Sequence, residues 1–241
     1  MTKIQAILRI MEDNGGVATL DIIYNNIEKY YPSIKSSIQW QAGIRGVLYR
    51  EVGERKLFKK IGVGIYALQD YIVEQKPKLQ EDIRLHSFIE GLCIELGNFN
   101  GYHTYTADPS SFYRDNLKLK DLTSLQTLPK FSYDNILEEA TRIDVIWLNK
   151  KGLVFPQKIF EVVDSIGTLN GAFNRCLQLQ NFRSEFFIIA PEKHRKKFEK
   201  TINLEIHKNN KERFRFINYD EIQMLYDSTI KTKDIDNLIF G

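Results

Sequence analysis

The sequence predicts an α/β (α+β) protein in which a mixed central sheet is flanked by helices and preceded by a small helical domain. Residues 3–68 carry apolar residues at helical spacing and then two short alternating stretches. Residues 71–80 are polar, contain a proline and show little periodicity, as expected of a linker. From residue 81 onward, apolar strand-like runs alternate with helical patterns, which is typical of a sheet covered on both faces. We therefore expect domains at 1–70 and 81–241.

The N-terminal domain is predicted to contain three helices followed by a hairpin. Helix-spaced apolar residues end at Asn14-Gly15-Gly16, resume after Thr19 and stop again at Pro32, and Ser36-Ser37 is a candidate cap for the third helix. A glycine-containing turn separates the last two stretches. The expected helices are residues 3–13, 19–30 and 38–52, and the expected strands are 57–61 and 64–68. This order within about 70 residues is the pattern of a winged helix.

Charge is concentrated in this first part of the chain. The formal net charge is only +3, but residues 1–69 carry ten Lys/Arg against six Asp/Glu. Seven of these basic residues lie between Lys35 and Lys60, a stretch with two acidic ones. Such a local excess predicts a surface that meets phosphates, although a solvated face is the alternative.

Composition excludes several classes of protein. The hydrophobic fraction of 43% and the charged fraction of 27% are those of a globular chain. No apolar run is long enough to span a bilayer, and the N-terminus lacks the pattern of a signal peptide. Two cysteines, Cys93 and Cys176, are too few for a disulfide or zinc framework. We expect a cytoplasmic protein with no membrane partner.

Three segments of the N-terminal domain carry a resemblance. Residues 19–30, the helix SSIQWQAGIRGVLYRE and the closing KLFKKIGVGIYAL are similar to the winged helix-turn-helix domains that accompany some bacterial restriction and modification proteins. The resemblance implies that the third helix enters the major groove of double-stranded DNA, where Gln and Arg read base edges. The candidate DNA-binding residues are Gln39, Trp40, Gln41, Arg45, Tyr49 and Arg50 on the helix and Lys56, Lys59 and Lys60 on the wing. The alternative is a domain for protein contact or dimerisation, with Trp40 anchored in its core.

The C-terminal domain is predicted to alternate helix and strand. We expect helices at 83–96, 169–182, 193–200 and from 220 onward, and strands at 102–107, 142–148, 158–163, 186–190 and 214–218. Residues 108–140 are predicted to be irregular and polar, and a connection of this length is usually functional. We expect it to contact DNA bases, with Arg114 and Lys118 among the contacting residues.

Two carboxylates stand within apolar strands of this domain. Asp144 interrupts the strand at 142–148, and Glu161 interrupts the strand at 158–163. An ionised carboxylate in a buried strand costs several kcal/mol unless it is paired or binds a metal. A turn-rich segment separates the two strands, so they are expected to be neighbours. Together the carboxylates offer the oxygen ligands that Mg²⁺ prefers.

This arrangement resembles the PD-(D/E)XK nuclease superfamily. The match is Asp144, then 16 intervening residues, then Glu161-Val162-Val163. The phrases HSFIEGLCIELGNFNGY and FEVVDSIGTLNGAFNRCLQLQNF are similar to a restriction-endonuclease-like group, over about residues 84–200. The resemblance implies a site in which Asp144, Glu161 and the carbonyl of Val162 hold Mg²⁺, with Mn²⁺ as a substitute. No glycine-rich phosphate loop is present, so no nucleotide cofactor is expected.

The match departs from the family at Val163, where relatives carry Lys or Glu. Gln178 or Gln180 on the following helix could replace that group, and Asp164 could add a ligand. Lys158 is near in sequence, but strand alternation directs it away from Glu161. A relative that binds DNA without cutting it is the alternative.

The first helix of this domain offers further candidates. In many relatives this helix sends a carboxylate toward the metal, and Glu90 is the better candidate, with Glu95 second; an ordinary surface glutamate is the alternative. His86 lies one turn before Glu90, although a single helix histidine is more often structural.

The function we expect is that of a Type II restriction endonuclease that cuts double-stranded DNA as a homodimer, because one metal site cuts one strand. Arg142 and Arg175 would hold phosphates near the cleft. The alternatives are a catalytically silent DNA-binding regulator and a nuclease for methylated or branched DNA.

Overall fold

The computed structural model describes residues 1–52, 56–73, 82–115 and 117–240. The chain divides into two compact units, Met1–Lys76 with Arg114–Leu117, and Pro77–Tyr113 with Lys118–Gly241. The sequence predicted one boundary between two continuous domains, whereas Arg114–Leu117 belongs to the first unit. Most of the expected linker, residues 74–80, lies outside the described residues.

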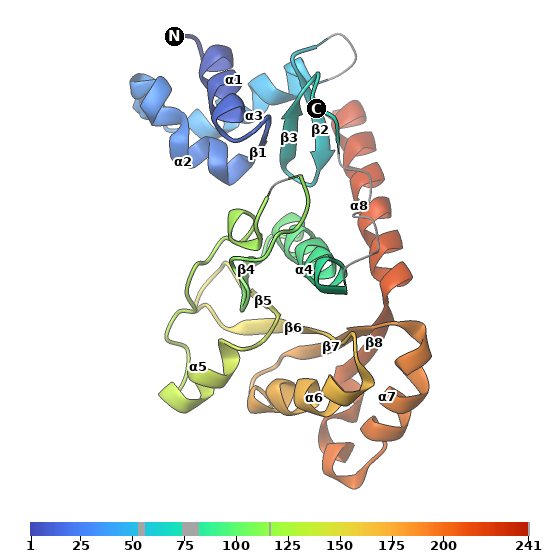
Figure 1. The fold of residues 1–241 in the computed structure, drawn as a ribbon. Coiled ribbons are helices and arrows are strands. Elements are labelled where there is room, and N and C mark those ends of the chain that lie inside the picture. The colour runs from blue at the N-terminus through green and yellow to red at the C-terminus, as the bar shows by residue number, and fades with distance from the viewer. Residues whose placement is uncertain (53–55, 74–81, 116, 241) are drawn as a thin grey trace. The chain divides into compact units, whose positions relative to one another are not determined.

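The first unit contains three helices and a three-stranded antiparallel sheet (Figure 1). Its elements are α1 (Lys3–Asp13), β1 (Val17–Thr19), α2 (Leu20–Tyr30), the 3₁₀ helix η1 (Pro32–Ser36), α3 (Trp40–Glu51), β2 (Phe58–Gly62) and β3 (Ile65–Leu68). The strand order is β1-β3-β2. The Thr19 hydroxyl caps α2 by accepting from the Ile22 N–H at 3.1 Å. The predicted helices and hairpin are present.

Two details of this unit differ from the expectation. Strand β1 was not predicted, because its three residues are all buried and show no alternation. Helix α3 begins at Trp40 rather than at Ile38, because Ile38 and Gln39 form a turn after η1 ends at Ser36, and Ile38 is fully exposed.

The second unit is built around a five-stranded mixed sheet. Its elements are α4 (Asp82–Phe99), β4 (His103–Thr106), α5 (Asp134–Ala140), β5 (Val145–Leu148), β6 (Pro156–Val162), α6 (Leu169–Gln178), β7 (Glu185–Ala190), α7 (Arg195–Ile202), β8 (Phe214–Asn218) and α8 (Tyr219–Phe240), with 3₁₀ helices η2 (Leu119–Asp121), η3 (Ile166–Thr168), η4 (Glu192–His194) and η5 (Glu205–Arg213). The strand order is β4-β5-β6-β7-β8. The first three strands pair antiparallel and the last three pair parallel.

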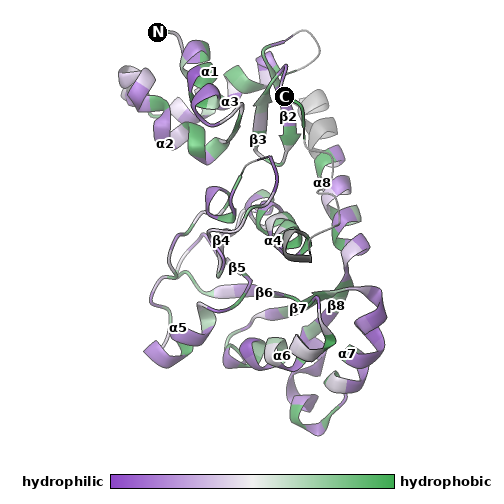
Figure 2. Ribbon diagram, in the orientation of Figure 1, coloured by the Kyte–Doolittle hydropathy of each residue, from purple (hydrophilic) through white to green (hydrophobic). Residues whose placement is uncertain are grey.

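Helices cover both faces of this sheet (Figure 1). On the face of α6 and α7, Phe173 and Phe198 pack with Ile159 and Phe186 of the strands in one hydrophobic core. Figure 2 shows α7 as mostly hydrophilic, and the few residues that it buries include Phe198 and Ile202. The predicted mixed sheet flanked by helices is therefore confirmed.

Helix α4 lies close against the other face. The Trp147 indole Nε1 donates a hydrogen bond to the Cys93 carbonyl at 3.0 Å. A Cβ atom on Gly97 would stand only 2.6 Å from that Nε1, so a glycine is required there for the helix to approach the strand. This packing holds the polar residues of α4 over the end of the sheet.

Two expectations for this unit need correction. Residues 134–140 form α5, which was expected to be irregular; its seven residues are too few for a periodic pattern to stand out. Strand β5 begins at Val145, so Asp144 immediately precedes the strand instead of interrupting it. Asp144 thus lies where the chain enters the sheet from the turn after α5.

Candidate active site

Asp144 and Glu161 lie opposite each other at one end of the sheet. Strands β5 and β6 are neighbours, as predicted, and they pair antiparallel, with Val145 opposite Phe160. Continuing that register by one residue places Asp144 opposite Glu161. The Val162 N–H donates to Asp144 Oδ2 at 2.7 Å, which fixes the Asp144 carboxylate at the C-terminal end of β6.

Glu161 is fully buried and is paired with an arginine. Arg175, on α6, donates from Nε to Glu161 Oε1 at 2.8 Å, and its Nη2 donates to Oε2. Burial and the negative charge of Asp144 raise the pKa of Glu161 to about 8, and the ion pair with Arg175 keeps it from rising further. Both oxygens of Glu161 are therefore engaged by one guanidinium.

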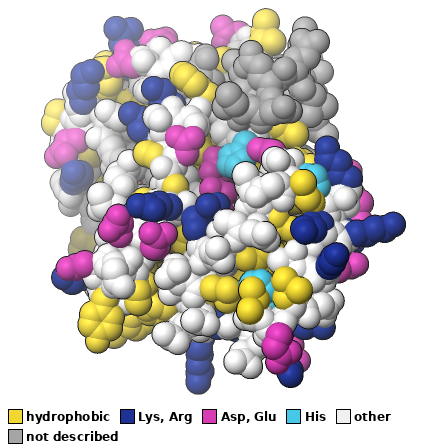
Figure 3. All heavy atoms as spheres, turned by 60° about the horizontal axis from the view of Figure 1, so that its bottom comes forward, with side chains coloured by type: hydrophobic (Ala, Val, Ile, Leu, Met, Phe, Trp, Pro, Cys, Tyr) yellow, Lys and Arg dark blue, Asp and Glu magenta, His cyan; other side chains and the backbone are white. Residues whose placement is uncertain are grey.

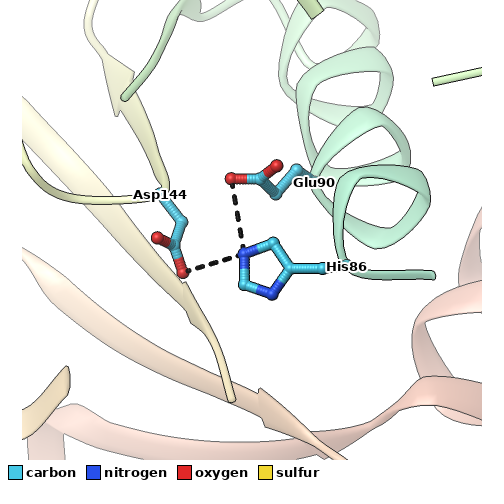
Figure 4. A group of neighbouring side chains, drawn as sticks. All are labelled: His86, Glu90 and Asp144. Atoms are coloured by element: carbon cyan, nitrogen blue, oxygen red, sulfur yellow. Dashed lines mark ion pairs between the residues drawn. The ribbon is translucent and has the colours of Figure 1, made fainter. Parts of the chain in front are cut away.

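Asp144 also lies near two side chains of α4, His86 and Glu90 (Figure 4). His86 Nε2 lies 3.8 Å from Asp144 Oδ2 and 3.7 Å from Glu90 Oε1. One ligand atom of each of these three residues falls within 4.8 Å of the others. The Glu90 side chain is 1% exposed, and its Oε2 has no hydrogen-bond partner among the residues that the structure describes. We call His86, Glu90 and Asp144 the His-carboxylate cluster.

Asp164 holds the imidazole of His86 from behind. His86 Nδ1 lies 2.8 Å from Asp164 Oδ2, and the Tyr219 hydroxyl donates to Asp164 Oδ1. The main-chain carbonyl of Asp164 lies 3.1 Å from His194 Nε2. The ring of His86 is thereby oriented with Nε2 toward Glu90 and Asp144.

The electrostatics of this region favour a bound cation. Burial, followed by the charge of Asp144, raises the pKa of Glu90 well above its ordinary value, and burial raises the pKa of Asp144. Burial lowers the pKa of His86, but the hydrogen bond to Asp164 and the charge of Asp144 outweigh it, and the net shift is upward. Crowded carboxylates in a desolvated site are stabilised by a positive charge, supplied by a proton, a side chain or a metal ion.

One face of the protein combines charges of both signs. Figure 3 shows a histidine side chain against acidic side chains, with Lys and Arg side chains on either side. An acidic centre between basic groups can bring a cation to the middle of a surface that also attracts phosphates.

The other predicted residues of the catalytic site lie in different environments. Glu95 accepts hydrogen bonds from the hydroxyls of Tyr113 and Tyr226, both at 2.7 Å, so of the two helix glutamates only Glu90 belongs to the His-carboxylate cluster. Gln178 is exposed at the last residue of α6, and the contacts that define the cluster do not include it. Val163 is buried in the hydrophobic core.

The DNA-binding candidates of α3 are divided between exposed and half-buried side chains. Gln39, Gln41, Tyr49 and Arg50 are exposed. Trp40 packs edge-on against Tyr24 with ring centroids 5.4 Å apart. Arg45 Nη1 donates to the Tyr24 hydroxyl at 3.1 Å.

The remaining basic candidates have protein partners. Lys56 donates to the Arg50 carbonyl and Lys59 to the Tyr71 carbonyl, while Lys60 is half-buried. Arg114 Nη2 donates to the Ile61 carbonyl at 3.0 Å within the first unit. Lys118 lies over the ring of Phe112, and Arg142 pairs with Glu138 and Glu139 on the surface. Lys158 pairs with Glu185, in agreement with the alternation argument.

Sequence reasoning undervalued two residues. His86 was expected to be structural and Asp164 was only a possible extra ligand, yet they are joined and direct Nε2 toward the cluster. The spacing of His86 and Glu90, four residues apart on a helix, was a usable signal because such residues share one face. The link between His86 and Asp164, 78 residues apart, is not visible without the fold.

The comparison with protein families matches a region that covers most of the second unit. The model of the Type II restriction enzyme NmeDI C-terminal domain matches residues 69–238. The geometry defines a domain with a mixed sheet and a cluster of carboxylates at one end of that sheet. The family match covers more than half of the chain, and the chain therefore belongs to this restriction-enzyme family. Membership supports an endonuclease function in a restriction system and implies DNA binding.

No curated protein and no solved structure matched the chain. None of the helices in the described part of the chain combines the length and the apolar composition needed to cross a bilayer.

Proposed function

We propose that this protein is a divalent-metal-dependent, sequence-specific endonuclease of the PD-(D/E)XK type that cuts double-stranded DNA. The observation that carries the proposal is the set of largely buried carboxylates where α4 meets the ends of β5 and β6, in which Glu90 Oε2 lacks a hydrogen-bond partner among the described residues. A buried carboxylate oxygen without a partner is costly and is what a cation site looks like before the cation binds. Family membership supplies the reaction class.

The donor set fits a hard divalent cation. Asp144, Glu161, Glu90 and the Val162 carbonyl would hold Mg²⁺, with Mn²⁺ as a substitute. The bound metal would lower the pKa of a water molecule and neutralise charge on the scissile phosphate. The Val162 N–H keeps the Asp144 carboxylate in place, and Arg175 fixes Glu161.

Arg175 has a role in this site beyond the phosphate contact expected for it. Its guanidinium supplies the positive charge that Val163 cannot supply, because it reaches Glu161 from α6. When metal engages Glu161, the guanidinium could turn to a phosphate oxygen, and arginine is suited to both partners.

We propose that the first unit is a winged helix that contributes to recognition. Its order of three helices and a hairpin, with β1 pairing to β3, supports this proposal. Gln39 and Gln41 are exposed at the start of α3, where they could reach base edges, and Arg50 is exposed near its end, where it could contact a phosphate. Trp40 and Arg45 instead contact Tyr24, so we assign them to holding the helix in place.

A homodimer would let two copies of one site cut both strands. The direct test is incubation of the protein with phage DNA and Mg²⁺, Mn²⁺ or EDTA, beside Asp144→Ala. Discrete bands that need metal and Asp144 support the proposal. Smears that persist in the variant would point to contamination and would contradict it.

The second candidate function is a DNA-binding regulator that keeps the nuclease fold without cutting. The pairing of both Glu161 oxygens with Arg175 and the apolar Val163 favour it. Binding to DNA without cleavage in any metal would select it. Cleavage restricted to methylated or branched substrates would instead select a nuclease for those forms.

A further inference from the structure

We propose that His86 is a metal ligand through Nε2, so that the His-carboxylate cluster is a mixed nitrogen and oxygen site that binds Mn²⁺ or Co²⁺ more tightly than Mg²⁺. The inference rests on the proposed function because it concerns the same metal. It goes beyond an all-oxygen site by naming a ligand, the residues that position it and the metals that it favours.

The geometry places three donor atoms around one point. His86 and Glu90 are four residues apart on α4 and therefore project from the same side of the helix. Across from them, Asp144 is fixed by the Val162 N–H. Figure 4 shows the imidazole beside the two carboxylates, with Nε2 directed at both.

The separations fit a cation better than they fit direct hydrogen bonds. At 3.7 and 3.8 Å, the contacts of Nε2 with the two carboxylate oxygens are longer than hydrogen bonds. A metal with ligand bonds of about 2.0–2.2 Å holds adjacent donor atoms roughly 3 Å apart, so a small inward movement would complete the site.

Glu90 supplies an independent observation. Its side chain is 1% exposed, and in the described part of the chain Oε2 has no hydrogen-bond partner. Pairing with His86 through Oε1 leaves the buried Oε2 without a compensating contact. A metal ion bound by Glu90 would compensate for the burial of this carboxylate.

Asp164 and Tyr219 complete the argument. With the His86 Nδ1 proton donated to Asp164, the lone pair of Nε2 faces the cluster. The Tyr219 hydroxyl in turn holds Asp164. A carboxylate that orients a ligating histidine in this way is the usual support of metal-bound imidazole.

The nitrogen donor decides the choice of metal. Mg²⁺ favours oxygen ligands and keeps its waters, whereas imidazole suits transition metals. We therefore expect Mn²⁺ to bind at least about 10-fold more tightly than Mg²⁺, and His86→Ala to remove most of that difference. Asp164→Asn should weaken Mn²⁺ binding about 10-fold or more while leaving the ligand set intact.

The test is pulsed electron paramagnetic resonance on the full chain loaded with one equivalent of Mn²⁺. Nitrogen modulation from a directly bound imidazole is expected in the wild type and in His103→Ala, the matched control, because His103 contacts Ser124 and is not part of the cluster. It should disappear in His86→Ala. Titration of the free Mn²⁺ signal, with Mg²⁺ as competitor, measures the affinities.

Absence of nitrogen modulation in the wild type, or its persistence in His86→Ala, would overturn the proposal. Because the wild-type spectrum alone can overturn it, the test holds even if a variant fails to fold. Failure of the nuclease proposal is separate. Bound imidazole without DNA cleavage keeps His86 as a ligand and removes the nuclease. Cleavage with no bound imidazole keeps the nuclease and removes His86.

Discussion

Arg175 and Glu161 form a two-point ion pair in which Nε donates to Oε1 at 2.8 Å and Nη2 donates to Oε2. Glu161 is completely buried, whereas Arg175 retains 30% of its side-chain exposure. The pair joins the strand that carries the candidate catalytic carboxylate to the helix that follows it. It therefore connects the stability of the fold to the state of the site.

Removing Arg175 should destabilise the metal-free protein. Arg175→Ala leaves a buried carboxylate without its partner, which costs about 3–5 kcal/mol in a fully buried pair and about 2–4 kcal/mol here, because the arginine is partly exposed. Chemical denaturation measures the change in the free energy of unfolding. Arg142→Ala is the control, because that arginine pairs with exposed glutamates and should cost less than about 1 kcal/mol. Equal losses in the two variants would contradict this account of the pair.

The two glutamates of α4 should behave differently. Glu90→Gln should abolish metal-dependent cleavage while leaving the metal-free fold as stable as before or more stable, because it removes a buried charge. Glu95→Ala should remove the hydrogen bonds that two buried tyrosine hydroxyls donate to Glu95, at a cost of about 1–3 kcal/mol each, and keep activity per folded molecule. Thermal unfolding and cleavage rates measured on the same samples decide between them. A Glu90→Gln enzyme that still cuts would remove Glu90 from the site.

Much of the fold could be predicted from the sequence because its apolar periodicities are long and regular. Helices α1 and α2 and strands β7 and β8 fall within one residue of their expected ranges. The short elements β1 and α5 were not predicted, because three and seven residues are too few to establish a period.

The site could be predicted only in part. The burial of Glu161 and the partial burial of Asp144 follow from their apolar neighbours, but the partners of these carboxylates do not. Arg175 and His86 reach the carboxylates from helices on opposite faces of the sheet, and Asp164 reaches His86 from a segment 78 residues away. Such contacts depend on how the layers stack, which residue types and spacing do not determine.

The metal-free protein should lose stability as pH rises from about 4.5 to about 8. Burial raises the pKa of Glu161 to about 8 from its ordinary 4.5, and the pKa values of Glu90 and Asp144 shift in the same direction. The folded state therefore binds these protons more tightly than the unfolded chain does, and their release favours unfolding. Each pKa unit corresponds to about 1.4 kcal/mol.

Thermal unfolding in EDTA at a series of pH values measures this effect. Glu161→Gln should flatten the curve, and Mn²⁺ should restore stability at pH 8 because it replaces the lost protons. A stability that rises steadily over this range in EDTA would contradict the upward pKa shifts.

The exposed residues of α3 should control DNA affinity in different ways. Arg50→Ala should weaken binding to all sequences and lower the slope of log K against log salt by about 1, as expected for one phosphate contact. Gln41→Ala should reduce discrimination between sites with a smaller effect on the slope. Arg9→Ala, an exposed arginine on α1 paired with Glu12, is the control. Fluorescence anisotropy over a range of salt concentrations measures all three, and an unchanged slope in Arg50→Ala would exclude that phosphate contact.

The central claim is that the carboxylates at the ends of β5 and β6 perform metal-dependent hydrolysis of DNA. The most direct measurement compares wild type with Asp144→Asn, which keeps an oxygen able to accept from the Val162 N–H but removes the charge. The account predicts equal folding and equal DNA binding without metal, with a loss of at least about 1,000-fold in the rate of strand cleavage in Mg²⁺ or Mn²⁺. Cleavage by Asp144→Asn at a rate within about tenfold of the wild type would contradict it.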